Sequence, residues 1–378
     1  MNGPAAPPLR VLVVTEAGDA WPSGRIRALA YRDLFQQDGI SVDYVSRRVP
    51  SLTRITEQPG RLIGRWLAFG PGRALAELSD GLARAREASI LRRAREGYDV
   101  IYLQKVGSWP LVAALRQSCK ARLVYDLNDG VWLPSRAAFA GGRVRDILRS
   151  VDAVTCDNPG GLEFARSHNS SVFLVPDPAQ VELFDRRRSA ISRAPGGLVL
   201  GWIGSPATLF NLYVIWEPLE TLFTRFEHLT LRLVGTGHDR RLLPRFEKVR
   251  YTTRPSYSSE DMIEEVLRMD VGLFPMFDVQ DSSVRGILKA TLYMSGGACV
   301  VASPVGQTPE LITDGENGLL ARDGSEWLKK LSRVVEDASY RQRLADGGLA
   351  TVREKFSVRQ SYECLLRALS GARAGESV

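Results

Sequence analysis

A glycine-rich turn and two cations in the second half of the chain have the chemistry needed to bind a diphosphate. The segment Gly201–Pro206 (GWIGSP) lies between a buried-type strand and a helical pattern, where free backbone N–H groups suit phosphate oxygens. A plain tight turn is the alternative for this segment. Further along, Arg285-Gly286 opens a predicted helix that carries Lys289. Because cations can offset the charge of a departing diphosphate where no metal is available, we assign Arg285 and Lys289 the catalytic role.

The stretch 270–320 places these cations beside a second glycine-rich turn. The helix that carries Lys289 stops at Gly296, and a strand over Cys299–Ala302 leads into the turn Ser303–Gly306. Ligands of open α/β sheets bind beyond the carboxyl ends of the strands. The sequence therefore predicts a diphosphate site at this edge of a sheet.

Polar residues also follow predicted strands in the first half of the chain. Gly24 and Arg25 come after the first strand, whereas Lys105 and Asp129 each follow a later one. We expect them to share the ligand-binding edge of that sheet. Arg25 and Arg27 are two residues apart on a helix and point in different directions, so only one of them should face this edge. Turn chemistry, helix caps and solvated charge remain the alternative for each residue.

Short apolar runs alternate with helical patterns along the whole chain, which predicts parallel, doubly wound sheets. The predicted strands are Leu9–Thr15, Val42–Ser46, Val100–Leu103, Arg122–Asp126, Val151–Cys156, Val172–Val175, Leu198–Ile203, Leu229–Val234, Val249–Tyr251, Val271–Phe274 and Cys299–Ala302. The 378 residues suffice for two domains, and the polar segment Phe184–Gly197 is the predicted linker. We expect an α/β fold with Rossmann-like domains over 1–185 and 186–356 and a last helix over 357–378.

The second half also carries spaced identities to a known family. From Lys289 the chain reads KATLYMSGGACVVASPVG, then Glu310, then DGENGLL from Asp314. This order resembles the nucleotide-sugar site of family 4 of the retaining glycosyltransferases, with its pattern K-x-L-E-Y-M-A-x-G-x-P-V-V-A-S-x-x-G, a Glu and D-G-x-N-G-L-L. The resemblance implies a GT-B fold, in which two Rossmann-like domains face each other and a C-terminal helix crosses back to the N-terminal domain.

Two features of the family pattern are missing from this chain. Val284 and Leu292 stand where the family has a Glu-x7-Glu pair, and the cations that usually follow the first glycine-rich turn are absent. The chain resembles a divergent branch in which other groups hold the donor sugar. The resemblance implies that Gly204, Ser205, Asp281, Ser283, Gly286, Gly306 and Glu310 bind the donor, and that Gly24, Arg25, Lys105 and Asp129 bind the acceptor.

The activity that the resemblance implies is transfer of a sugar from a nucleotide-sugar donor to a hydroxyl acceptor with retention of configuration. The nucleotide sugar is then a substrate, and no cofactor is expected. Independence from metal ions is also expected, because Asp126 and Asn128 come nearest to an Asp-x-Asp pair and the chain has three histidines. An inactive or weak nucleotide-sugar-binding subunit, a nucleotide-sugar epimerase and a bilobal binding protein remain the alternatives.

The net positive charge comes from the first half of the chain. Residues 1–195 hold 28 Lys/Arg and 20 Asp/Glu and the remainder holds 22 and 23, which gives the net charge of +7. The excess favours an anionic acceptor or an acidic membrane surface, with a merely solvated surface as the alternative. Residues 61–95, with eight arginines and with Trp66 and Phe69, fit a basic amphipathic helix that lies on a membrane or packs on its own domain.

Apolar runs, signal regions and cysteine spacing predict the cellular compartment of the protein. The chain lacks a run of about 18 apolar residues that could cross a membrane, and no signal regions precede the first strand. The four cysteines show no metal spacing. We expect a cytoplasmic protein without a nucleic-acid partner, with peripheral contact to the inner membrane face through 61–95 as an option.

Overall fold

The computed structural model describes residues 9–57, 71–133, 139–191, 197–238, 241, 243, 245–279, 284 and 286–371. For residues 54–57 and 71–76 it describes the backbone alone. These residues form two compact units. The residues up to Pro178 together with those from Val358 form unit 1, and Ala179–Ser357 form unit 2. The predicted linker begins too late in the chain, because Phe184 is fully buried in the core of unit 2.

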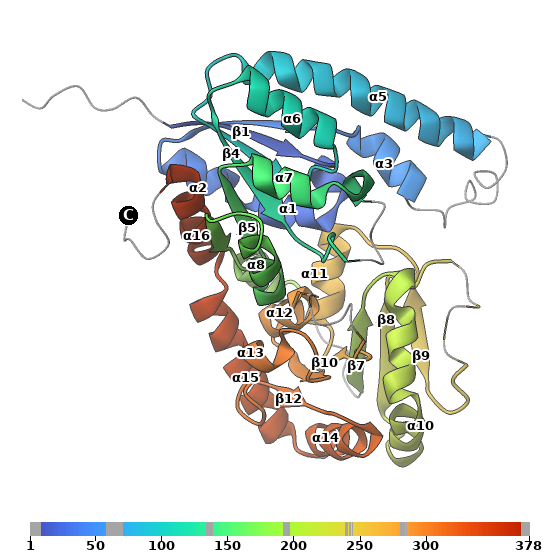
Figure 1. Ribbon diagram of the computed structural model, residues 1–378. Coiled ribbons are helices and arrows are strands. Elements are labelled where there is room, and N and C mark those ends of the chain that lie inside the picture. Colours follow the sequence, from blue (N-terminus) through green and yellow to red (C-terminus); the bar gives the residue numbers. More distant parts are fainter. Residues whose placement is uncertain are drawn as a thin grey trace, which may run out of the picture. The chain divides into compact units, whose positions relative to one another are not determined.

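Unit 1 is built on a parallel six-stranded sheet with strand order β2-β1-β3-β4-β5-β6 (Figure 1). The strands are β1 (Arg10–Thr15), β2 (Ser41–Ser46), β3 (Val100–Gln104), β4 (Arg122–Leu127), β5 (Ala153–Cys156) and β6 (Val172–Leu174). Central strands such as β3 are buried along their whole length, as expected for an apolar run with helices on both faces. The strand order reverses between β1 and β3, where ligands of such sheets bind.

Helices cover both faces of this sheet. They are α1 (Pro22–Arg27), α2 (Arg32–Gln37), α3 (Pro50–Glu57), α5 (Pro71–Ala94), α6 (Trp109–Ser118), α7 (Val144–Ser150), α8 (Pro159–Arg166) and α16 (Val358–Ser370). Leu12 and Val14 of β1 pack with α5, α6 and α7, whereas Val11 and Val13 pack with α2 and α16. This alternation follows from the two-residue period of a strand.

The last helix, α16, packs in unit 1 although it follows unit 2 in the chain. Tyr362 and Leu365 are fully buried among residues of β1 and β3. The ring of Tyr362 also meets Phe35 of α2 edge-on, with 5.0 Å between the centroids. Arg122 of β4 donates to the carbonyl oxygen of Ala368 at 3.1 Å. The helix thus completes the core of the first sheet.

Unit 2 holds a second parallel six-stranded sheet, with strand order β12-β11-β10-β7-β8-β9. The strands are β7 (Leu198–Ile203), β8 (Leu229–Val234), β9 (Tyr251–Arg254), β10 (Val271–Phe274), β11 (Cys299–Ala302) and β12 (Leu319–Leu320). The helices are α9 (Val181–Arg188), the 3-10 helix η5 (Pro206–Ile215), α10 (Trp216–Arg225), α11 (Ser259–Leu267), α12 (Leu288–Gly296), α13 (Thr308–Leu311), α14 (Gly324–Glu336) and α15 (Ala338–Lys355). The order reverses between β7 and β10. The two sheets confirm the predicted fold class.

Two predicted element boundaries in unit 2 are wrong. The strand expected from Val249 begins at Tyr251. The helix that carries Lys289 begins at Leu288 rather than at Arg285-Gly286, since glycine is a poor helix former and Ile287 takes the N-cap. The helix ends as predicted, with Gly297 in the left-handed conformation at φ +73°.

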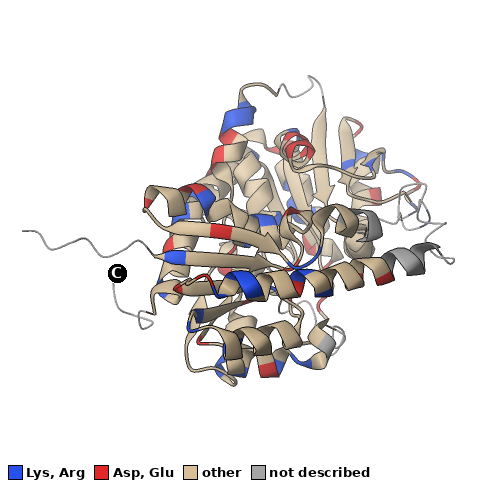
Figure 2. Ribbon diagram, turned by 90° about the horizontal axis from the view of Figure 1, so that it is seen from above, with Lys and Arg blue, Asp and Glu red and all other residues tan. Residues whose placement is uncertain are grey.

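The long helix α5 contains most of the segment that was considered for membrane contact. Its residues Ala83, Ile90 and Ala94 are buried in unit 1, which is the commoner fate of an apolar stripe. Arg86 donates to the carbonyl oxygen of Ser46 at 2.7 Å. Figure 2, a view from above, shows basic and acidic residues interspersed over the elements. Trp66 and Phe69 lie outside the described residues, so membrane contact through 61–95 stays a prediction.

Candidate active site

The glycine-rich turn after β7 lies directly against the side chain of Lys289. A Cβ atom on Gly204 would stand 2.5 Å from the indole of Trp202 and 2.8 Å from Nζ of Lys289. A side chain at this position would therefore displace the indole of Trp202 or the ammonium group of Lys289. The Gly204 N–H donates to the carbonyl oxygen of Val234 at 2.9 Å, which ties the turn to the end of β8.

The side chains of Trp202 and Thr208 hold the ammonium group of Lys289. Its Nζ lies 4.6 Å from the ring centroid of Trp202 and donates to Oγ1 of Thr208 at 3.3 Å. Thr208 in turn accepts a hydrogen bond from the N–H of Ser205 at 3.2 Å. A cation over an aromatic face is attracted to the ring electrostatically. Lys289, Gly204 and Ser205 thus lie together where the strand order reverses, and their role in binding a diphosphate stays a prediction.

A second pair of glycines closes this edge beyond β8. Gly235 has φ +82°, and a Cβ atom on it would stand 2.0 Å from the carbonyl oxygen of Gly204. Gly237 has φ +72°, and a Cβ atom on it would stand 2.7 Å from the ring of Pro206. The loops after β7 and β8 therefore approach so closely that no side chain fits between them.

The turn after β11 is tied to the end of β10. Oγ of Ser303 accepts from the N–H of Met276 at 3.0 Å, and Gly306 takes the left-handed conformation at φ +61°. Glu310 is exposed in the short helix α13, and no contact among the described residues joins it to Lys289. Gly306 and Glu310 thus lie in the segment that follows β11, and their part in donor binding stays a prediction.

Several predicted donor residues cannot be placed. Asp281, Ser283 and Arg285 lie outside the described residues, and their roles stay predictions. Gly286 lies just before α12. Val284 and Leu292, which stand in place of the family's Glu pair, are both buried at 8% exposure.

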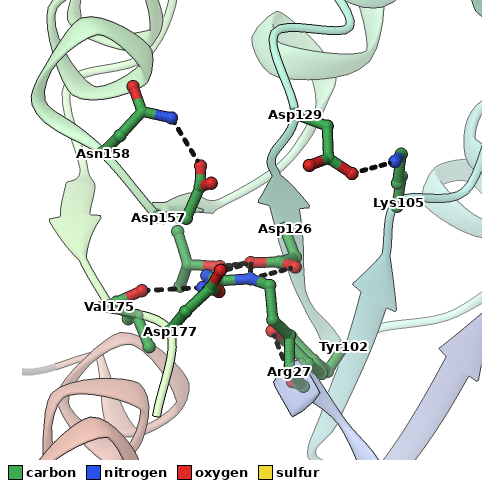
Figure 3. A network of polar contacts seen from close by, with 10 residues as sticks. Arg27, Tyr102, Lys105, Asp126, Asp129, Asp157, Asn158, Val175 and Asp177 are labelled. Carbon is green, nitrogen blue, oxygen red and sulfur yellow. Dashed lines mark hydrogen bonds and ion pairs between the residues drawn. The ribbon is translucent and has the colours of Figure 1, made fainter. Parts of the chain in front are cut away.

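In unit 1 a buried arginine joins the end of β4 to the segment that follows β6, at the carboxyl edge of the sheet (Figure 3). Arg27 is 1% exposed. Its guanidinium donates to both oxygens of Asp126 at 2.7–3.1 Å, to Asp177 at 2.7 Å and to the carbonyl oxygen of Val175 at 2.8 Å. Burial disfavours its charge, but the carboxylates of Asp126 and Asp177 more than offset this and raise the pKa of Arg27. Arg27 thus lies at this edge, and acceptor binding by Arg25 stays a prediction.

Asp157 is a buried carboxyl group beside this network. It follows β5 directly and accepts from Nδ2 of Asn158 at 2.8 Å. Burial, and after it the charge of Asp177, raises the pKa of Asp157 well above its usual range. It stays protonated to a higher pH than an ordinary aspartate and can then donate a hydrogen bond. Sequence reasoning missed Asp157 and Asp177, although each follows a predicted strand and that position was the available signal.

Two predicted acceptor residues meet at this edge. Lys105 and Asp129 form an ion pair, and the ring centroid of Trp21 lies 5.3 Å from Nζ of the lysine. Both paired residues have a positive φ, +52° for Lys105 and +58° for Asp129, which residues other than glycine seldom adopt. Backbone strain of this kind is concentrated at functional sites.

The contacts of the other two predicted acceptor residues are local, and their part in acceptor binding stays a prediction. A Cβ atom on Gly24 would stand 2.0 Å from the carbonyl oxygen of Gly18, so glycine is required here for packing. Arg25 is half-buried and donates to the carbonyl oxygen of Asp19 at 2.7 Å. Neither contact involves Lys105 or its partner.

Two kinds of feature are absent from the described residues. Within the ranges given above, no group of three or more His, Cys, Asp or Glu side chains is placed to hold a metal ion. In the same ranges, every helix is too short or too polar to cross a membrane.

The site of unit 2 coincides with a match to a known family. Residues 198–337 match the model of the family described as glycosyl transferases group 1. Unit 2 is similar to the glycosyl transferases of group 1. A D-inositol 3-phosphate glycosyltransferase of Nocardioides sp. (strain ATCC BAA-499 / JS614) is 30% identical over 119 residues, which is 30% of this chain. The chain thus spans 25% of the length of that glycosyltransferase.

Solved structures resemble the chain over nearly its whole length. The Anabaena protein HepE, solved with UDP and glucose, has a TM-score of 0.64 at 16% identity and covers 96% of this chain and 99% of its own. Sucrose-phosphate synthase from Thermosynechococcus elongatus has a TM-score of 0.66 at 16% identity, with 96% and 100% covered. At this identity the likeness establishes the fold, which is that of two-domain GT-B glycosyltransferases.

Proposed function

We propose that the protein is a glycosyltransferase that moves a sugar from a nucleotide-sugar donor, bound by unit 2, to a hydroxyl acceptor. The observation that carries this proposal is the position of the Lys289 ammonium group against Gly204 and Ser205. A fixed cation beside a tight glycine turn, where the strand order reverses, suits the diphosphate of a nucleotide sugar. The family match covers this same edge. Because HepE was solved with UDP-glucose, a uridine diphosphate sugar is the first donor to test.

The proposed reaction needs little covalent chemistry from the protein. The bond between the anomeric carbon and the diphosphate oxygen breaks, and the acceptor oxygen bonds to that carbon on the same face. The acceptor proton passes to the departing phosphate, whose growing charge Lys289 offsets. Retention, and the absence of a cofactor, belong to this proposal.

The activity is tested with the purified full-length chain and UDP-glucose in the absence of an acceptor. Slow release of UDP and glucose is the expected result, because water replaces the missing hydroxyl. UDP binding without release from any nucleotide sugar would instead indicate a binding subunit. Conversion of the sugar while it stays attached to UDP would indicate an epimerase.

We expect catalysis to be independent of metal ions. In the proposal the charge of Lys289, and of Arg285, takes the place of a divalent cation at the diphosphate. UDP-glucose hydrolysis should therefore proceed at an unchanged rate in excess EDTA. A rate that vanishes with the chelator and returns with Mn²⁺ or Mg²⁺ contradicts this prediction.

For the acceptor, we expect Lys105→Met to raise the KM of a glycosyl acceptor by about tenfold. The ammonium group lies at the carboxyl edge of unit 1, and a charge-assisted hydrogen bond to an acceptor oxygen would be lost. Donor hydrolysis should not change, and stability should fall by less than about 1 kcal/mol, because Asp129 is half exposed. Lys120→Met is the matched control, since Lys120 is exposed elsewhere in unit 1. A KM that is equal in both variants removes Lys105 from the acceptor site.

A further inference from the structure

Unit 1 contains a pocket that lies outside the network of Arg27, Asp126 and Asp177. Its volume is about 210 Å³, and its walls include Trp132, Leu133, Phe139, Val144 and Phe164. The rings of Trp132 and Phe164 are stacked, with centroids 5.1 Å apart and planes 11° apart. Arg145 supplies the charge among the described lining residues and is exposed at the surface. The pocket is therefore mainly aromatic and aliphatic.

The pocket adjoins the edge that carries the polar acceptor candidates. The ring of Phe139 passes 3.4 Å from where a Cβ atom on Gly107 would stand, and Gly107 lies two residues after Lys105. The indole of Trp132 lies 3.1 Å from where a Cβ atom on Gly161 would stand. The N–H of Gly161 donates to Oδ1 of Asn158. These glycines follow β3 and β5, so the pocket lies just beyond the strands whose ends carry Lys105 and Asp157.

The charge at this edge does not favour a bare anion. Lys105 is paired with Asp129, and Arg27 is enclosed by Asp126 and Asp177. Beyond these ion pairs, the edge has polar groups that can form hydrogen bonds and the apolar surface of the pocket. A ligand with a hydroxyl group attached to an apolar group can bind to both.

The volume limits the size of that apolar group. An apolar cavity of about 150 Å³ holds a benzene molecule. A pocket of about 210 Å³ therefore holds one substituted ring or a hydrocarbon of similar bulk, but not a long lipid chain. Aromatic walls such as Trp132 and Phe164 favour a ring, because rings stack face to face with an offset.

We propose that this pocket holds a ring-sized apolar group of the acceptor, so that the acceptor is a hydroxyl compound built on such a group. This inference rests on the proposed function, in which unit 1 binds the acceptor. It assigns the pocket residues a part in acceptor specificity, alongside the polar residues at the strand ends.

The test compares two glucosides that differ only in the aglycone. Binding of 4-fluorophenyl β-D-glucoside to the full-length chain is followed by fluorine NMR, and methyl β-D-glucoside serves as a competitor without an aromatic ring. We expect the aryl glucoside to bind and an excess of the methyl glucoside to displace it poorly. Leu133→Phe fills the pocket and Phe164→Ala removes one stacking partner, so each should weaken aryl binding by about tenfold.

Leu174→Phe is the matched control for Leu133→Phe, because Leu174 is 39% exposed on unit 1 away from the pocket. It should leave aryl binding unchanged, and equal unfolding midpoints in all variants exclude a folding defect. Equal displacement by both glucosides, or full affinity in Leu133→Phe, overturns the inference. Competition of UDP with the aryl glucoside also overturns it, since the pocket would then hold a nucleobase.

The same samples separate this inference from the proposed function. UDP-glucose hydrolysis by the wild-type chain reports on the donor reaction alone. If hydrolysis is absent but the aryl glucoside binds in the pocket, the proposed function fails. If hydrolysis proceeds and the variants lose no aryl affinity, only the assignment of the pocket fails.

Discussion

Replacing Arg27 with methionine is expected to lower the free energy of unfolding of unit 1 by about 3–5 kcal/mol. The substitution keeps most of the volume of the side chain but removes the guanidinium group. Asp126 and Asp177, which are bound to it at 2.7 Å, would then be buried carboxylates without a counter-charge. Urea unfolding followed by circular dichroism measures the loss. Arg92→Met, on the exposed side of α5, is the control and should change stability by less than about 0.5 kcal/mol.

The loss in Arg27→Met should depend on pH. In the folded protein the pKa of Asp177 is already raised, chiefly by burial, and the arginine opposes that rise. Without the arginine the folded pKa rises further above the unfolded value of about 3.9. A carboxyl with a raised folded pKa destabilises the fold above its unfolded pKa, and protonation relieves this as the pH falls. The gap between variant and wild type should therefore be widest near neutral pH and narrow toward about pH 4. A loss below about 1 kcal/mol at neutral pH contradicts the buried network.

Replacing Lys289 with alanine is expected to weaken UDP binding by about 1.5–3 kcal/mol, or roughly ten- to hundredfold. The ammonium group is held over Trp202 and against Gly204, so that it meets the diphosphate without reordering. Isothermal titration calorimetry with UDP measures the change. The variant should unfold at nearly the wild-type midpoint, because a half-buried cation contributes little to stability.

Lys329→Ala is the matched control for Lys289→Ala, since Lys329 is an exposed lysine of the same unit. Its UDP affinity should equal that of the wild type. Equal affinities in both variants would remove Lys289 from the donor site. Arg254 at the end of β9 is another cation of unit 2, but it would not take the place of Lys289, because Glu265 and Asp261 already bind its guanidinium at 3.0 and 2.7 Å.

Much of the fold could be predicted because it depends on local patterns. Runs such as that of β7 have one apolar character from end to end, and glycines such as Gly297 mark where a helix stops. Boundaries failed where local signals competed. Gly286 lies inside an apparent helical pattern but delays the start of α12, and Phe184 lies in a charged segment but is drawn into the core.

For the sites, the sequence could predict only which residues directly follow a strand. Lys289 and Gly204 were both found, but their contact through Trp202 depends on which strands are neighbours. The network of Arg27 is harder still, because its partner Asp177 is 150 residues away in the chain. Nothing in the local sequence around Arg27 distinguishes a buried arginine from a solvated one.

The return of α16 to unit 1 has a consequence for synthesis of the protein. The chain passes from unit 1 to unit 2 after Pro178 and returns after Ser357, so unit 2 is an insertion within unit 1. On the ribosome the first sheet emerges early, yet the face that α16 covers stays uncovered until the residues after Ser357 have been made. Unit 2, continuous in the chain, can complete its core before unit 1 does, which reverses the usual order in which the N-terminal domain folds first.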